Sequence, residues 1–419
     1  MKAALADFVN DTPAGREAGA ILRSCVHCGF CLPSCPTYQL LGDELDSPRG
    51  RIYLMKQLLE GQPVTARTQL HLDRCLGCRA CESACPSGVQ YGRLLDFGRA
   101  LTEERVTREP GTGLKRYLLR KIMPYASRAR ALVNIARIAR PLLPPSLSRQ
   151  LPRRARRQSA WPPARHTRRV LLLEGCVQPA LAGAISPAAA RVLDRLGISA
   201  VRVAGSGCCG ALAHHLSAHE ESLAQIKSNI DALWPHVETG VEAVVMTASA
   251  CSYMLSDYGR LLQDDPHYGA RAARIASLAR DISQVVAAEA AALTAALRRA
   301  ARAQPGGVAP ATRVAFQAPC SLQHALKVLG VVEPLLLGAG FTLTPVSDGQ
   351  RCCGSAGTYS ILQPELSLRL LQSKVAALES GSPDVIATAN IGCLNHIRGG
   401  TSVPVRHWIE LIAERLPDG

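Results

Sequence analysis

Aromatic residues and long apolar runs are scarce in this chain. Only 4% of its 419 residues are Phe, Trp or Tyr, too few for the stacking surface with which proteins bind single-stranded nucleic acids. No run reaches the about 18 uncharged apolar residues that a membrane-spanning helix needs. The first residues, MKAALADFVNDTPAGREAG, contain acids where a secretory signal would have its apolar stretch. We therefore expect a protein that is made and kept in the cytoplasm.

Acidic residues are absent from one long segment. Residues 115–169 contain 16 Lys or Arg and no Asp or Glu, whereas the net charge of the whole chain is +15. Apolar and basic residues mix at helical spacing in LKRYLLRKIMPYASRARALVNIARIARPLL, as they do in interfacial helices. The segment predicts docking to an anionic membrane surface, on the inner face of the cell membrane, or to an acidic partner; a solvated linker is the alternative. Nucleic acid is not an expected partner, because no helix-turn-helix pattern accompanies the basic residues.

Cysteine is abundant, and the 16 cysteines fall into four sets of four with none left over. Cytoplasmic proteins keep their thiols reduced, so metal or redox sites explain these residues better than disulfides do. The sets are Cys25, Cys28, Cys31 and Cys35; Cys75, Cys78, Cys81 and Cys85; Cys176, Cys208, Cys209 and Cys251; and Cys320, Cys352, Cys353 and Cys393.

The first two sets follow the pattern C-x2-C-x2-C-x3-C-P, which is typical of two-cluster ferredoxins. Three thiolates of one tight loop bind one 4Fe–4S cube, and the fourth, followed by proline, reaches the other cube. We therefore expect Cys85 to join the first three cysteines of the first loop, and Cys35 to join those of the second. Structural zinc is the alternative, but zinc usually takes separated C-x2-C pairs. Within the first loop, His27 is expected to be solvated.

The chain divides into four segments by composition and pattern. The pattern of residues 1–110 indicates short helices around cysteine loops and predicts an α-helical two-cluster ferredoxin-like domain. A basic connector at 111–169 follows this domain. Beyond it, β-branched runs each end just before a cysteine and precede helix-like stretches, a pattern that predicts α/β units with a parallel sheet. Adding 144 to positions 176, 208 and 209 gives three further cysteines, and both central pairs occur in Cys-Cys-Gly. We therefore predict a duplicated α/β Cys-Cys-Gly domain, at 170–305 and 306–419.

Each Cys-Cys-Gly domain offers four thiols near the carboxyl ends of predicted strands. Because such ends converge at one edge of a parallel sheet, we expect the third and the fourth set each to come together. Four thiols fit a further iron–sulfur cluster, a zinc site or a dithiol pair, and inert buried cysteines are the alternative. Adjacent side chains in extended backbone point to opposite sides, which argues against both cysteines of a pair lying in an apolar core. Since His324 and His396 offer imidazole ligands where the first repeat has Met254, we expect the second repeat to bind metal more firmly.

With these motifs in view, the chain resembles the iron–sulfur subunits of bacterial glycolate oxidases over nearly its full length. The resemblance rests on CVHCGFC, CPTYQLLGDELDSPRGRIYL, CPSGV, EGC, CCGSAGTY, TANIGC and VRHWIE. The arrangement is also similar to the C subunit of anaerobic glycerol-3-phosphate dehydrogenase and to heterodisulfide reductase subunits. In the latter, each repeat ends in C-x2-C, where this chain has Met254 and His396 in place of the second cysteine.

The resemblance implies an electron-transfer subunit in a complex whose FAD-binding subunits oxidise glycolate to glyoxylate. Electrons would pass through two 4Fe–4S clusters held by the eight ferredoxin-type cysteines, with quinone as the acceptor. No residue of this chain would be catalytic. The equivalent subunit of a glycerol-3-phosphate or lactate dehydrogenase, or of a heterodisulfide-reductase-like complex, is the alternative.

Overall fold

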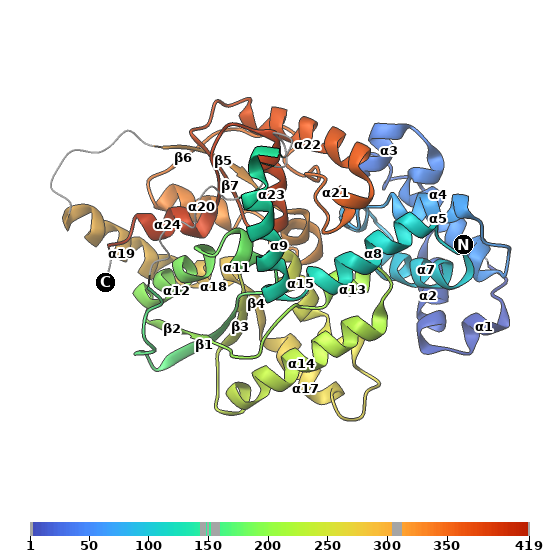
Figure 1. Cartoon of the computed structure of the whole chain (residues 1–419), viewed down its shortest axis with the longest axis horizontal. Helices are drawn as coiled ribbons and strands as arrows, with labels where there is room; N and C mark the ends of the chain where they lie inside the picture. The colour runs from blue at the N-terminus through green and yellow to red at the C-terminus, as the bar shows by residue number, and fades with distance from the viewer. Residues whose placement is uncertain (1–2, 143–147, 149–150, 152–159, 304–311, 418–419) are drawn as a thin grey trace.

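The structure is a computed structural model that describes residues 3–142, 148, 151, 160–303 and 312–417. Part of the expected basic connector and the expected boundary at 305/306 therefore lie outside the described residues. The N-terminal helices form one end of the molecule, and the two sheets with their helices form the rest (Figure 1).

Short helices surround both cysteine loops of the N-terminal region, as expected. Their bounds are α1 (Asp7–Asn10), α2 (Pro13–Ser24), α3 (Pro36–Leu41), the 3-10 helix η1 (Glu44–Asp46), α4 (Pro48–Leu59), α5 (Ala66–Asp73), α6 (Ala80–Ser83) and α7 (Tyr91–Arg105). The starts of three of these helices are specified locally, since Thr12, Ser47 and Thr65 each accept a hydrogen bond from a backbone N–H of the first turn. Proline at the first helical position pre-sets the backbone of α2, α3 and α4.

The basic segment is helical where it is described. It forms α8 (Pro110–Ile122), α9 (Ala126–Ile138) and the 3-10 helix η2 (Arg140–Leu142). Buried Arg116 donates to the carbonyl of Leu216 at 3.0 Å, and Arg120 and Lys121 both pair with Glu221. These contacts attach α8 to the first repeat. Among the described residues, no helix combines the length and the apolar character that crossing a membrane requires.

The first repeat is a parallel sheet with the strand order β2-β1-β3-β4. Its elements are β1 (Arg168–Leu173), α11 (Gln178–Leu181), α12 (Ile185–Arg195), β2 (Ile198–Arg202), α13 (Ala211–His215), α14 (His219–Glu238), β3 (Ala243–Met246), α15 (Ser249–Ser256), α16 (Tyr258–Leu261), α17 (Gly269–Leu278), β4 (Ala279–Asp281), α18 (Ile282–Ala288) and α19 (Ala290–Ala303). All four residues of β3 are buried, as in parallel sheets covered on both faces.

The second repeat has the same topology, with the parallel order β6-β5-β7-β8. Its elements are β5 (Arg313–Gln317), the π-helix η3 (Ser321–Ala325), α20 (Val332–Gly338), β6 (Thr342–Leu343), α21 (Tyr359–Leu362), α22 (Pro364–Glu379), β7 (Val385–Thr388), α23 (Ile391–Gly400), β8 (Val405–His407) and α24 (Trp408–Glu414). The matching strand orders are what an internal duplication produces. The α/β units with parallel sheets expected from the sequence are therefore present.

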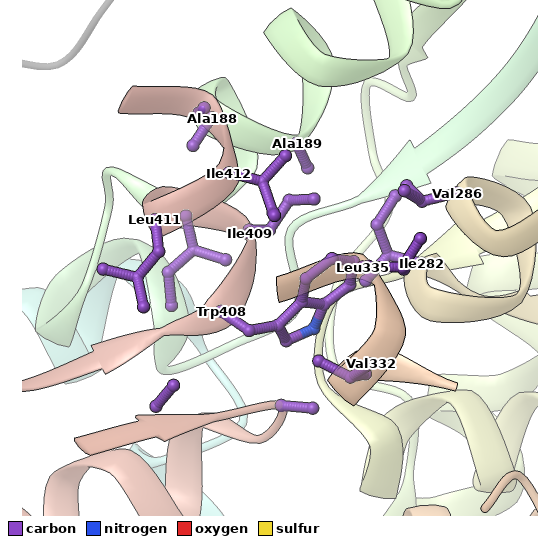
Figure 2. Packing of buried hydrophobic residues seen from close by; sticks show 14 of the residues in the cluster. Ala188, Ala189, Ile282, Val286, Val332, Leu335, Trp408, Ile409, Leu411 and Ile412 are labelled. Atoms are coloured by element: carbon purple, nitrogen blue, oxygen red, sulfur yellow. The ribbon is translucent and has the colours of Figure 1, made fainter. Parts of the chain in front are cut away.

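The two repeats share one hydrophobic core. Residues of α12 and α18 in the first repeat belong to the same buried cluster as residues of α20 and α24 in the second. Figure 2 shows the fully buried ring of Trp408 beside Val332 and Leu335, with Ile282 and Val286 of the first repeat close by. The imidazole of His407 also bonds to the carbonyl oxygen of Thr247 at 2.8 Å across the repeats. The shared core therefore fixes the two cysteine sets relative to each other.

Candidate metal centres

The first cavity gathers thiols from both ferredoxin-type loops. It is lined by Cys25, Cys28 and Cys31 of the first loop and by Cys81 and Cys85 of the second. Burial and the neighbouring thiols of Cys25, Cys28 and Cys85 raise the pKa of Cys31 to about 11. Cys25, Cys28, Cys31 and Cys85 are therefore near neighbours. They are the four cysteines that the sequence spacing assigns to one cluster.

The second cavity gathers the complementary four thiols. Cys35 lines it together with Cys75, Cys78 and Cys81. Burial raises the pKa of Cys81 well above its usual range, and the other three thiols add to the shift. Cys81 and Tyr91 border both cavities, so the two cavities adjoin.

Left-handed backbone shapes both loops in the same way. Positive φ values occur at His27 and Gly29 around Cys28, and at the equivalent Gly77 and Arg79 around Cys78. This conformation is uncommon for residues other than glycine and is retained where the surroundings demand it. The two turns direct the three thiols of each loop into one cavity. The expectation of a solvated His27 is wrong for its Nε2 atom, which is buried beside the cavity without a hydrogen-bond partner among the described groups.

A buried polar network supports the second cavity. The guanidinium of Arg51, in a side chain only 1% exposed, donates to the backbone carbonyl of His71 at 2.7 Å and to the hydroxyl of Thr37 at 3.0 Å. It also pairs with the fully buried carboxylate of Asp46 at 3.1 Å and lies 3.9 Å from Sγ of Cys35. The sequence patterns did not indicate this role, although DELDSPRGR lies within the longest stretch that carries the resemblance and contains the charged residues Asp46 and Arg51, which are buried.

Further contacts complete the support of the second cavity. Tyr91 donates its hydroxyl to Sγ of Cys75 at 3.6 Å, and Arg74 donates to the second carboxylate oxygen of Asp46 at 2.9 Å. Two arginines and one histidine thus surround Asp46. Donors and positive charge near a thiolate favour its ionised form and tune the potential of a metal bound to it.

In the first repeat, the third cysteine set comes together where the strands end. Cys176 follows β1, and Cys251 lies on α15 just after β3. Hydrogen bonds from Cys176 and Cys209 lower the pKa of Cys208 below its usual range, and hydrogen bonds with Cys208 and Cys251 raise the pKa of Cys209. The thiols therefore form a chain of four in one place.

In the second repeat, the fourth set has the same arrangement. Hydrogen bonding links Cys320 to Cys352 and Cys353 to Cys393, and the pKa values of Cys320 and Cys353 lie well above the usual range. The amide side chain of Asn390 also donates to Sγ of Cys393 at 3.6 Å.

Both adjacent pairs are buried, but only Cys209 and Cys353 belong to hydrophobic clusters, so neither pair lies wholly in an apolar core. Cys208 and Cys209 are 5% and 3% exposed, and Cys352 and Cys353 are 3% and 1% exposed. The backbone turns directly after each pair, with a positive φ of 91° in Gly210 and 88° in Gly354. Neighbouring thiols can therefore approach different members of one set.

The histidines of the second repeat have other partners. Nδ1 of His324 contacts the hydroxyl of Ser83 at 2.9 Å, and Nε2 of His396 contacts the hydroxyl of Ser367 at 3.1 Å. At the equivalent place in the first repeat, Met254 is 3% exposed and belongs to a hydrophobic cluster with Cys209. The fully buried Nε2 of His324 has no partner among the described groups.

The second ferredoxin-type loop lies at the junction of the two repeats. Toward the second repeat, Ser83 contacts His324, and the hydroxyl of Tyr359 donates to the carbonyl of Arg74 at 3.0 Å. Toward the first repeat, the guanidinium of Arg79 lies 4.3 Å from the centre of the Tyr253 ring. Burial raises the pKa of Cys78 well above its usual range, and the nearby thiol of Cys320 in the second repeat adds to the shift.

Comparisons with known proteins agree with this arrangement. The family described as "4Fe-4S dicluster domain" matches residues 21–89, and the family described as "Cysteine-rich domain" matches residues 170–256 and 314–398. The first match is to a domain for two 4Fe–4S clusters, and the matched residues include all eight cysteines that line the two cavities.

The chain is also similar to curated proteins over its length. It is 47% identical to the "Glycolate oxidase iron-sulfur subunit" of Escherichia coli (strain K12), covering 99% of each chain. It is 32% identical to the "Probable glycolate oxidase iron-sulfur subunit" of Bacillus subtilis (strain 168), covering 94% of each. A "Lactate utilization protein A" from Shouchella clausii is 26% identical over 53% of this chain and 88% of its own length. The chain therefore belongs to the family of glycolate oxidase iron–sulfur subunits.

Proposed function

We propose that this chain is the electron-transfer subunit of a flavin-dependent glycolate oxidase, in which FAD-binding subunits convert glycolate to glyoxylate. The observation that carries the proposal is the pair of adjoining cavities, which the eight ferredoxin-type thiols of the two loops line between them, with Cys81 at the border of both. Four thiolates are the donor set of a 4Fe–4S cube, so the residues present fit the group. When bound, such clusters supply one-electron carriers, and the chain itself contributes no catalytic residue.

The proposed ligands follow the two cavities. Cys25, Cys28, Cys31 and Cys85 hold one cluster, and Cys35, Cys75, Cys78 and Cys81 hold the other. The chain's own part is to keep the two sites adjacent and to place Arg51 and Tyr91 against two thiols of the second. The Cys-Cys-Gly sets are proposed as further metal or cluster sites, with the second repeat next along the route because Cys320 neighbours Cys78.

The acceptor is proposed to be quinone, which requires the complex to lie near a membrane. The exposed apolar side chains of α8, α9 and the turn between them support a peripheral position on the inner face of the membrane; they include Leu114, Tyr117, Leu118, Tyr125, Leu132, Ile135 and Ile138. Basic residues on the same helices add attraction to anionic lipid. Three basic residues of α8 form ion pairs within the chain: Arg116 pairs with Glu103, and Arg120 and Lys121 pair with Glu221. Fewer basic residues are therefore available to bind lipid than the sequence count implies.

A second candidate is the equivalent subunit of a lactate or glycerol-3-phosphate dehydrogenase. The match to lactate utilization proteins favours it, but these relatives cover only 53–59% of this chain. Purification of the native complex with its flavoprotein, followed by turnover with glycolate, lactate and glycerol 3-phosphate, separates the candidates. Glycolate should support the fastest turnover, and the isolated chain should oxidise none of the three.

Paired substitutions test the clusters and the crossed ligand sets together. Each lost cluster removes about four irons per chain relative to the wild-type protein. Cys25→Ser combined with Cys85→Ser should remove about four irons, because both residues belong to one set. Cys25→Ser combined with Cys35→Ser should remove about eight, because the residues belong to different sets. Equal losses from the two pairs contradict the crossed assignment, and active, zinc-loaded protein without iron contradicts the clusters altogether.

A further inference from the structure

The two ferredoxin-type loops differ sharply in their exposure to solvent. Val26 and Phe30 of the first loop are 66% and 67% exposed. At the equivalent positions of the second loop, Leu76 is half-buried and Ala80 is buried. Among the 16 cysteines, all of which the structure describes, Cys28 alone is exposed. The first cluster site is therefore the one that meets the outside of the molecule.

The surface around the first loop extends onto α4. The guanidinium of Arg49 lies against Gly29, so closely that a Cβ atom added there would be 3.1 Å from it. Tyr53 follows one helical turn later and is 47% exposed. Arg49 pairs with Glu44 at 2.8 Å, and both side chains are partly exposed. We call the surface made by Val26, Phe30, Arg49 and Tyr53 the loop face.

The loop face has the composition of a protein interface. Large apolar side chains gathered on a surface beside charged ones mark interaction sites, and aromatic residues are enriched at the centres of interfaces. Here the apolar residues flank an exposed thiol that is a proposed cluster ligand. Folding of this chain alone does not bury Val26 or Phe30, although the same fold buries the equivalent Ala80 of the other loop.

We propose that the loop face is the docking surface for a flavin-binding subunit, which delivers electrons to the first cluster site. This inference rests on the proposed function. Electron transfer weakens steeply with distance, so a donor outside the chain must approach a site that reaches the surface. The second site is covered by the repeats through Ser83, Arg79 and Cys78, and electrons that enter at Cys28 therefore move inward toward Cys320.

The test measures the affinity of this chain for its flavin-binding subunits, with iron content determined on the same samples. Phe30→Glu places a charge at the centre of the loop face, and removal of an aromatic anchor weakens binding by at least about tenfold. Tyr53→Glu changes the same face from α4, outside the cysteine loop, and remains informative if Phe30→Glu loses iron. Leu337→Glu is the matched control, because Leu337 is 54% exposed and lies on α20, well away from the N-terminal helices (Figure 1).

We expect Tyr53→Glu, and Phe30→Glu where it retains iron, to bind at least about tenfold more weakly than the wild type, while Leu337→Glu binds unchanged. Wild-type affinity in both loop-face variants overturns the inference. Normal complex formation with a selective loss of quinone reduction overturns it too, because the face then serves the acceptor. A change only in self-association of the isolated chain assigns the face to a second copy. A wild-type chain that binds no flavoprotein contradicts the proposed function itself.

Discussion

Replacing Arg51 with methionine should destabilise the ferredoxin-like region far more than the same change at Arg49. Both arginines lie on α4, two residues apart, and each pairs with one carboxylate. The Arg51 and Asp46 side chains are 1% and 0% exposed, whereas those of Arg49 and Glu44 are 35% and 45% exposed. The comparison therefore holds the helix and the substitution constant, while the burial of the pair and the further hydrogen bonds of Arg51 differ.

The magnitude follows from what each arginine leaves behind. Removing one partner of a buried ion pair costs about 3–5 kcal/mol, since the remaining charge is buried without full compensation. Arg51→Met also leaves the carbonyl of His71 and the hydroxyl of Thr37 without their donor. Arg74 still contacts Asp46, so we expect about 4 kcal/mol and not a larger loss. Arg49→Met should cost at most about 1 kcal/mol, because exposed ion pairs contribute little.

Anaerobic urea titration of the intact, cluster-loaded protein can measure the difference. With a denaturant slope of about 2 kcal/mol per M, Arg51→Met should lower the midpoint of visible-absorbance loss by about 2 M. A cycle with Asp46→Asn should show a coupling of about 0.5–3 kcal/mol, because the two groups are in direct contact. Equal midpoints for the Arg49 and Arg51 variants would refute the view that burial makes this network essential.

Two further changes address the repeats and the basic helices. Cys353→Ala should lower metal content and electron transfer more than Cys209→Ala, because the second repeat's thiols neighbour Cys78. If both variants keep wild-type metal content, stability and electron transfer, these cysteines serve only in packing. Combined Lys115→Gln and Arg130→Gln should weaken flotation with anionic vesicles by about 30-fold, at about 1 kcal/mol for each basic residue near the surface; equal binding to neutral and anionic vesicles would contradict electrostatic docking.

The sequence by itself specified the features that depend on spacing. The interval between thiols, with proline after the fourth, predicted that each loop sends its fourth thiol toward the other loop, and Cys85 and Cys35 do line the cavities of the opposite loops. The offset of 144 predicted two equivalent units, and two sheets of equal strand order follow from it. Strand-like runs before Cys176 and Cys320 correspond to β1 and β5, since apolar β-branched runs of that length are typical of buried parallel strands.

Only the tertiary structure decided what surrounds each site. The two ferredoxin-type loops have the same cysteine spacing, yet one lies at the surface and the other lies between the repeats, because packing joins residues as distant in sequence as Ser83 and His324. Burial of Arg51 likewise depends on Asp46, Thr37 and His71 meeting around it, which helical periodicity does not reveal. Spacing therefore determined which thiols group together, and long-range packing determined which group meets solvent and which group meets the second repeat.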